Sequence, residues 1–179
     1  GKTTAMRMLC GLSYPTSGTG RVAGFDINTQ QEEIKKHIGY MSQKFSLYDD
    51  LKVWENIRLF AGIYGLSDEV IARRTDEVLH TLGLEAERNT MVKSLPLGWK
   101  QKLAFSVATF HRPDIVFLDE PTGAADPNTR RQFWELIYQA ADQGITIFVT
   151  THYMDEAEFC GRVSIMVDGR YGHWIRPEA

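Results

Sequence analysis

Two groups of residues have types and spacing that suit chemistry on a phosphate. The first is Gly-Lys-Thr-Thr at residues 1–4, which matches the end of the motif GxxxxGK[ST], where backbone amides surround phosphate groups. In this pattern Lys2 adds a point charge and the Thr3 hydroxyl coordinates Mg²⁺, while Gly1 and Thr4 belong to the amide cradle. Four residues alone are also compatible with an ordinary helix start and a solvated lysine.

The second group is a pair of adjacent carboxylates. Residues 114–120, DIVFLDE, form an apolar run that ends in Asp119 and Glu120. The first acid suits Mg²⁺ binding, and the second suits orienting and deprotonating a water molecule. A strand end whose acids simply face solvent is the alternative. The chemical role is favoured because α/β sheets bind ligands at the carboxyl edge of their strands.

The elements around these residues predict an α/β fold. The β-branched runs at 114–120 and 145–152 do not alternate, which is typical of parallel strands buried on both faces. Pro127 starts a helix between them, giving a βαβ crossover, and residues 163–167 would add another strand. Upstream, the patterns predict short strands at 20–23 and 37–43, and helices at 2–12, 51–65 and 67–82.

An unusual stretch, SLPLGWKQKLAF, follows at residues 94–105. Its 3.6-residue period predicts a helix with Leu97, Ala104 and Val107 on the inner face, which leaves Trp99 toward the other side. Proline, leucine, glycine and tryptophan crowd the start, where a plain cap needs only one short polar residue. The start of this helix is therefore either a cap with additional hydrophobic residues or an altered ligand-binding loop.

Composition places the chain among soluble globular proteins. Of 179 residues, 43% are hydrophobic and 24% charged, and no apolar run approaches the roughly 20 residues of a membrane helix. The net charge of −3 gives no electrostatic reason to expect nucleic-acid binding. Cys10 and Cys160 form no CxxC pattern, so we expect neither a disulfide framework nor a zinc site, and a reducing cytosolic setting fits best.

Taken together, the motifs resemble the nucleotide-binding subunit of ATP-binding-cassette (ABC) ATPases. Gly-Lys-Thr-Thr, Gln43 after a strand, LDEP, and a later strand ending in His152 follow the family's order over essentially the whole chain. The resemblance implies a P-loop NTPase fold, α/β with a mostly parallel sheet and an inserted helical subdomain. The first part of the phosphate loop and the family's N-terminal strands are missing. We therefore expect a fragment that starts inside the Walker A motif and binds ATP poorly on its own.

The resemblance also implies a domain organisation. Residues 1–179 would be a single, partial ABC ATPase domain. Residues 1–48 and 112–179 would form its RecA-like core, and residues 49–111 its helical subdomain with the signature helix.

Roles for individual residues follow from the resemblance. Glu120 would activate water, Gln43 would contact Mg²⁺ or that water, and His152 would contact the γ-phosphate. Thr3, Gln43 and Asp119 would hold the Mg²⁺. Without the family context, Gln43 and His152 are equally well explained as ordinary strand-end side chains.

Residues 94–105 fall where the family carries its signature, usually LSGGQ, which contacts ATP held by the opposite subunit. The signature positions are occupied by Pro96, Leu97, Gly98 and Trp99. Pro96 removes a hydroxyl and an N–H donor, and Leu97 puts a side chain where close backbone approach is wanted. The signature is therefore altered, and the site that it completes should be weaker. Asp126 occupies the family's D-loop, although Asp before Pro is also an excellent helix N-cap.

The function implied is that of the ATP-hydrolysing subunit of an ABC exporter, which binds ATP and Mg²⁺ and pairs head to tail with a second ABC ATPase domain. Residues 44–56 and the LPLG signature most resemble ATPases with a separate ABC-2-type membrane subunit, including ones with two fused ATPase domains. This implies a peripheral protein on the cytoplasmic face of the inner membrane. A soluble ABC ATPase acting on ribosomes or DNA, and a regulatory ABC module with weak hydrolysis, are the alternatives.

The membrane subunit would contact the surface where residues 44–56 lead into the helical insert. A plausible apolar contact set there consists of Phe45, Leu47, Tyr48 and Trp54. The alternative is that these side chains pack internally between the subdomains.

Overall fold

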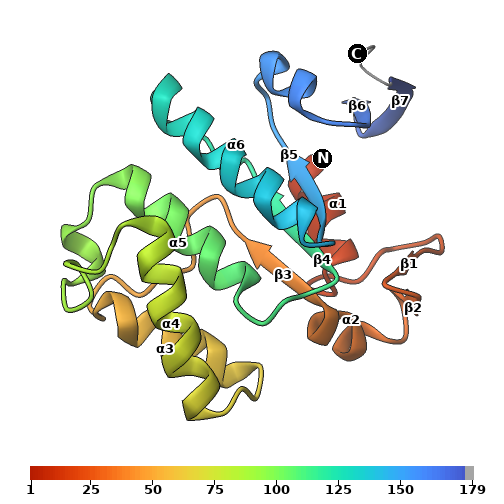
Figure 1. The fold of residues 1–179 in the computed structure, drawn as a ribbon. Helices are drawn as coiled ribbons and strands as arrows, with labels where there is room; N and C mark the ends of the chain where they lie inside the picture. The colour runs from red at the N-terminus through yellow and green to blue at the C-terminus, as the bar shows by residue number, and fades with distance from the viewer. Residues whose placement is uncertain (176–179) are drawn as a thin grey trace.

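A three-stranded parallel sheet lies at the centre of the computed structural model, which describes residues 1–175 (Figure 1). Its strands are β3 (Ile38–Met41), β4 (Ile115–Asp119) and β5 (Thr146–Thr150), with β4 in the middle. All three run in the same direction, so their carboxyl ends meet at one edge of the sheet. The predicted βαβ crossover from β4 to β5 is confirmed.

Helices cover both faces of this sheet. On one face, α1 (Lys2–Leu9) and α2 (Gln31–His37) pack against Phe117, and on the other, α5 (Leu97–Thr109) and α6 (Pro127–Asp142) pack against Val116 and Leu118. The middle strand is therefore buried on both faces, as its sequence predicts. The prediction of burial on both faces is wrong for β5. The cluster formed by α1 and α2 does not extend over this outer strand, and Phe148 is therefore 40% exposed.

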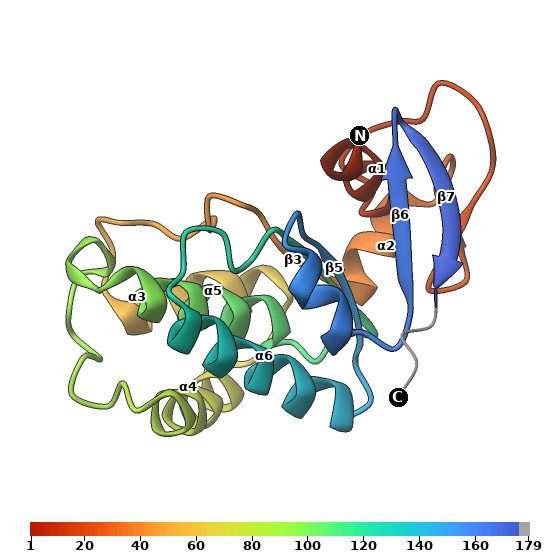
Figure 2. The ribbon, with the colours of Figure 1, turned by 90° about the horizontal axis from the view of Figure 1, so that it is seen from above.

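The inserted segment is helical, as predicted. It contains α3 (Val53–Ile63), α4 (Asp68–Leu82) and the short 3₁₀ helix η1 (Val92–Ser94), and α3 and α4 pack together beside α5 (Figure 2). The Ser67 hydroxyl caps α4 by accepting a hydrogen bond from the Val70 N–H at 3.4 Å.

The α5 helix is buried on two sides rather than one. Ala104 and Ala108 belong to the cluster under the sheet, whereas Leu103 and Val107 belong to the cluster with α3 and α4. The prediction of a single inner face that includes Leu97 is wrong, because Leu97 is 45% exposed at the start of the helix. Trp99, placed on the outer face by the period, is half-buried against the α3–α4 cluster.

The remaining elements are small. Strands β1 (Arg21–Val22) and β2 (Phe25–Asp26) pair antiparallel, and a 3₁₀ helix, η2 (Met154–Phe159), follows β5. The predicted strand at 163–167 exists as β6 (Val163–Val167), but it pairs antiparallel with β7 (Arg170–Ile175) in a separate hairpin instead of joining the parallel sheet. None of the helices in residues 1–175 combines the length and apolar character needed to cross a membrane.

Gly39 permits the close packing of α5 against β3. A Cβ atom at this position would lie 2.0 Å from the carbonyl oxygen of Ala108 and 3.3 Å from Val116 Cγ2. The first contact is with the backbone of α5, which cannot move aside as a flexible side chain does. The end of α5 is therefore held directly against the strand.

We predict that Gly39→Ala lowers the free energy of unfolding by about 3 kcal/mol, since the helix must shift away from the strand to make room. Gly62→Ala is the matched control, because Gly62 lies in α3 and a Cβ there would meet nothing within 4 Å. Alanine at residue 62 should leave the stability unchanged or raise it. Thermal unfolding of the two variants of the intact protein measures the difference, and equal unfolding temperatures would contradict the predicted clash.

Candidate functional site

The two sequence groups predicted to act on a phosphate lie next to each other. Thr3, in the first turn of α1, donates a hydrogen bond from Oγ1 to Asp119 Oδ1 at the end of β4, with a distance of 3.3 Å. Asp119 is 2% exposed and forms no ion pair within residues 1–175. A buried carboxylate without a cation is unfavourable, and hydroxyl and carboxylate oxygens are the ligands that Mg²⁺ prefers. The residues present therefore fit a bound Mg²⁺.

The start of α1 is open for an anion. Gly1 occupies its N-cap position, no side chain caps the helix, and its first turn contains no acidic residue. Residues 1–4 are exposed, and Lys2 makes no ion pair in the described part of the chain. Free N–H groups and the positive end of the helix dipole attract phosphate, and Lys2 adds to this attraction.

Glu120 brings the three candidate catalytic residues together. Its Oε2 atom accepts a hydrogen bond from Gln43 Nε2 at 2.9 Å and lies 3.3 Å from His152 Nδ1. Gln43 follows β3, Glu120 follows β4 and His152 follows β5, so each residue comes from the carboxyl end of a different strand. The sheet therefore assembles this cluster at its edge, as the sequence predicts.

The backbone of Glu120 is held in an uncommon conformation. Its φ angle is +47°, a value that non-glycine residues rarely adopt. The Glu120 N–H donates hydrogen bonds to Thr150 O at 3.0 Å and to Thr150 Oγ1 at 3.2 Å. Strained residues of this kind are found at functional sites, where the surrounding structure fixes them.

Thr150 is a site residue that the sequence analysis missed. Besides accepting from Glu120, its hydroxyl donates to Asp119 Oδ1 at 2.6 Å, so one side chain orients both acidic residues. A signal was available, because Thr150 is a polar residue directly after the largely apolar run of residues 145–149, and the structure places it opposite Asp119 in the parallel register.

Asp126 is the N-cap of α6. Its Oδ1 atom accepts hydrogen bonds from the N–H groups of Asn128 at 3.0 Å and Thr129 at 3.1 Å. The hydrogen bond from the Thr129 hydroxyl, reinforced by the Thr129 N–H, holds the pKa of Asp126 below its usual value. The cap interpretation is thus confirmed, and it leaves Asp126 negatively charged on an exposed loop.

The altered signature lies away from the Glu120 cluster. Pro96 is the N-cap of α5 and supplies no side-chain cap, and the start of α5 lies well apart from α1, which packs on the other face of the sheet (Figures 1 and 2). Gly98 packs closely against α6, since a Cβ there would lie 2.9 Å from Thr129 Cγ2. The structure therefore does not bring Pro96, Leu97, Gly98 and Trp99 into the same site as Lys2 and Glu120.

The apolar set at residues 45–54 is divided between interior and surface. Phe45 packs against the sheet cluster, and Leu47 packs against both the sheet cluster and the α3–α4 cluster. The alternative of internal packing therefore holds for these two. Trp54 is half-buried, whereas Tyr48 is 55% exposed.

Comparisons with known proteins agree with one another. The chain matches the family described as "ABC transporter" over residues 1–123. It is 44% identical over 170 residues to the probable multidrug ABC transporter ATP-binding protein YbhF of Escherichia coli (strain K12), covering 95% of this chain and 29% of that protein. It is 36% identical over 171 residues to the Nod factor export ATP-binding protein I of Cupriavidus metallidurans, covering 95% of this chain and 56% of that one.

Solved structures show the same fold. The dimeric, post-hydrolysis structure of the ATP-binding cassette MJ0796 bound to ADP and Pi superposes with a TM-score of 0.86 at 28% identity, covering 100% of this chain and 82% of that chain. The chain thus spans most of one such cassette but only 29% of the E. coli relative.

We predict that Thr150→Val lowers the free energy of unfolding by roughly 1.5 to 3 kcal/mol, because the buried Asp119 carboxylate loses its shortest hydrogen bond. Thr146→Val, at the exposed start of the same strand, should change it by less than about 0.5 kcal/mol. Urea unfolding of both variants, followed by tryptophan fluorescence, makes the comparison. Equal losses would show that the hydroxyl does not stabilise the acidic pair.

Proposed function

The chain belongs to the ABC transporter family, and from this membership we propose that it is the ATP-hydrolysing module of an ABC exporter. The observation that carries the proposal is the Glu120 carboxylate, held between Gln43 and His152 at the sheet edge where Thr3 meets Asp119. The names of two relatives, a probable multidrug ABC transporter protein and a Nod factor export protein, support export. They weigh against a role on ribosomes or DNA.

The phosphates of ATP would bind at the start of α1. The open N–H groups of residues 1–4 and the Lys2 ammonium group surround and attract the β- and γ-phosphates. Thr3, Gln43 and Asp119 would hold Mg²⁺, which when bound neutralises charge that develops on the phosphates. Gln43 can present its amide oxygen to the cation while its amide nitrogen donates to Glu120.

Hydrolysis would depend on Glu120. Its carboxylate would orient a water molecule and accept its proton as the water oxygen attacks the γ-phosphorus, while the bond from this phosphorus to the β,γ-bridging oxygen breaks and ADP leaves. His152, 3.3 Å from the same carboxylate, is placed to contact the γ-phosphate from the neighbouring strand. Both residues lie on the ends of a rigid sheet, which keeps the attack geometry within narrow limits.

A second ABC module would complete the site. Its signature would cover the ATP bound at Lys2, while Pro96, Leu97, Gly98 and Trp99 of this chain would cover the nucleotide of the partner. The separation of the start of α5 from α1 supports this arrangement in trans (Figures 1 and 2), and the MJ0796 cassette is described as a dimer. Asp126, on an exposed loop beside the start of α5, would lie at the same interface.

The altered signature suggests an unequal pair of sites. The partner's nucleotide would be held weakly, whereas the site of this chain would be fully active. A tandem or heterodimeric protein tolerates one weak site, so we favour that arrangement over a homodimer. Within the chain, residues 1–48 and 112–179 would act as the RecA-like core and residues 49–111 as the helical subdomain, in keeping with the separate cluster that α3, α4 and one side of α5 form.

The membrane partner would be an ABC-2-type subunit, and the module would lie peripherally at the cytoplasmic face of the inner membrane. The exposed Tyr48 ring, on the segment between Gln43 and α3, is a candidate contact for that subunit. Asn56 fixes this segment by accepting from the Tyr48 N–H at 2.8 Å and donating to the Tyr48 carbonyl at 3.0 Å.

We predict that Glu120→Gln lowers ATP turnover of the intact protein at least about 100-fold while ATP binding is retained, since glutamine cannot accept the proton. Glu135→Gln, on the exposed side of α6, is the matched control and should keep wild-type turnover. Phosphate release and nucleotide binding are measured for both. Undiminished turnover in Glu120→Gln would show that this module is not the hydrolytic one, and a regulatory role would then be favoured.

We predict that Pro96→Ser combined with Leu97→Gly raises turnover, because a hydroxyl and an unobstructed backbone return to the γ-phosphate of the partner site. Each restored contact to a charged group contributes roughly 1.5 to 3 kcal/mol. The gain should persist when Glu120→Gln is added, because it arises at the other nucleotide. If the added substitution removes the whole gain, the proposed contact in trans is wrong.

A further inference from the structure

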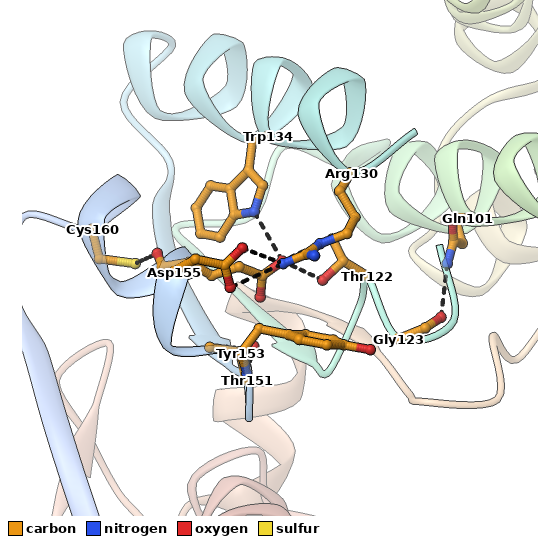
Figure 3. A network of polar contacts seen from close by, with 10 residues as sticks. Gln101, Thr122, Gly123, Arg130, Trp134, Thr151, Tyr153, Asp155 and Cys160 are labelled. Atoms are coloured by element: carbon orange, nitrogen blue, oxygen red, sulfur yellow. Dashed lines mark hydrogen bonds and ion pairs between the residues drawn. The ribbon is translucent and has the colours of Figure 1, made fainter. Parts of the chain in front are cut away.

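A buried carboxylate ties together the two segments that follow Glu120 and His152. Glu156, in η2, is 0% exposed, and its Oε1 atom accepts hydrogen bonds from Thr122 Oγ1 at 2.5 Å and Trp134 Nε1 at 3.2 Å. Arg130 Nε lies 3.5 Å from the same oxygen. In Figure 3, Thr122, Trp134 and Arg130 converge on this point from the loop after β4 and from α6.

Arg130 extends the network toward His152. Its terminal nitrogen binds Asp155 at 3.0 and 3.2 Å, and its guanidinium group lies 4.3 Å from the centre of the Tyr153 ring (Figure 3). Tyr153 in turn packs against the His152 ring, with a centroid distance of 4.2 Å. A chain of contacts therefore runs from Glu156 through Arg130 and Tyr153 to His152.

Thr122 forms the other arm of the network. It is buried two residues after Glu120, and the next carbonyl, that of Gly123, accepts a hydrogen bond from Gln101 Nε2 of α5 at 3.3 Å. The loop that leaves Glu120 is thus held on one side by Glu156 and on the other by the helix that begins with the altered signature.

The hydrogen bonds that Glu156 accepts do not require a negative charge. A neutral side-chain oxygen would satisfy Thr122 and Trp134 equally well, whereas a buried carboxylate is unfavourable unless it is paired. The second oxygen, Oε2, is buried and has no hydrogen-bond partner within residues 1–175. The charge therefore serves to attract the Arg130 guanidinium group. Through Arg130, it also holds the segment that follows His152.

We propose that Glu156 is a positioning residue for the ATP hydrolysis described above. It sets the position of Glu120 through Thr122 and that of His152 through Arg130 and Tyr153, so that both face one site. Within the described residues, Glu156 itself forms no hydrogen bond or ion pair with Glu120 or His152. The inference rests on the proposed function, because it assigns the network to that reaction.

Steady-state ATP hydrolysis by variants of the intact protein tests the inference. Thr122→Val, which removes only one hydroxyl, and Glu156→Gln, which keeps the acceptor oxygen but removes the charge, should each lower kcat by about tenfold. The KM for ATP should change less than about twofold, since the phosphate-binding residues belong to α1. Arg130→Lys should also lower kcat, and its combination with Glu156→Gln should be no slower than the slower of these two single variants, because both act on the contact between Glu156 and Arg130. Glu158→Gln, exposed in the same η2, is the control.

Each outcome has a distinct meaning. Lack of turnover in the wild-type protein would overturn the proposed function and this inference with it. Normal wild-type turnover, together with wild-type kcat in Thr122→Val and Glu156→Gln, would overturn the inference alone. The same holds if the losses in Glu156→Gln and Arg130→Lys add independently, or if kcat falls only in step with thermal stability. If Glu156→Gln does not fold, Thr122→Val and Arg130→Lys decide, and both should lower kcat without changing KM.

Discussion

The buried carboxylate of Asp119 is the constraint on which the site depends. It lies at the carboxyl end of the central strand, covered by helices on both faces, where a charge is tolerated only with strong hydrogen-bond donors or a cation. The hydroxyls of Thr3 and Thr150 supply two donors, one from α1 and one from β5. The same requirement thus brings α1 and the outer strand β5 together at Asp119, next to Glu120.

The parallel register explains why residues so far apart in sequence form one cluster. Gln43, Glu120 and His152 belong to segments separated by the helical insert and by α6, yet each follows a strand that ends at the same edge. The insert can vary in length and packing without moving these ends, because the strands are held by their own ladders. The cluster formed by α3, α4 and one side of α5 can therefore pack beside the sheet without changing the relative positions of Gln43, Glu120 and His152.

Much of this arrangement follows from local sequence. The polar residues near the strand ends were predictable, because apolar runs give way there to polar side chains: Asp119 ends β4, whereas Gln43 and His152 lie two residues beyond the ends of β3 and β5. The two-sided burial of α5 was not, since a helix enclosed by two clusters loses the single apolar stripe on which the 3.6-residue period depends. The exposure of Phe148 and the separate hairpin of β6 depend on which elements lie beside those strands. A run of apolar residues carries no information about its neighbours.

The contact between Gly39 and the carbonyl of Ala108 has a mechanical consequence for α5. It fixes the last turns of the helix to the sheet, whereas the first turn carries Pro96 and Leu97 at the far end. The helix has 13 residues, and at about 1.5 Å per residue it acts as a lever roughly 20 Å long. Tilting the helix by about 10° about its fixed end would displace its first turn, which packs against α6 at Gly98, by about 3 Å. A small rotation of the helical insert would therefore move the loop that would face a second module. The displacement is about the length of one hydrogen bond.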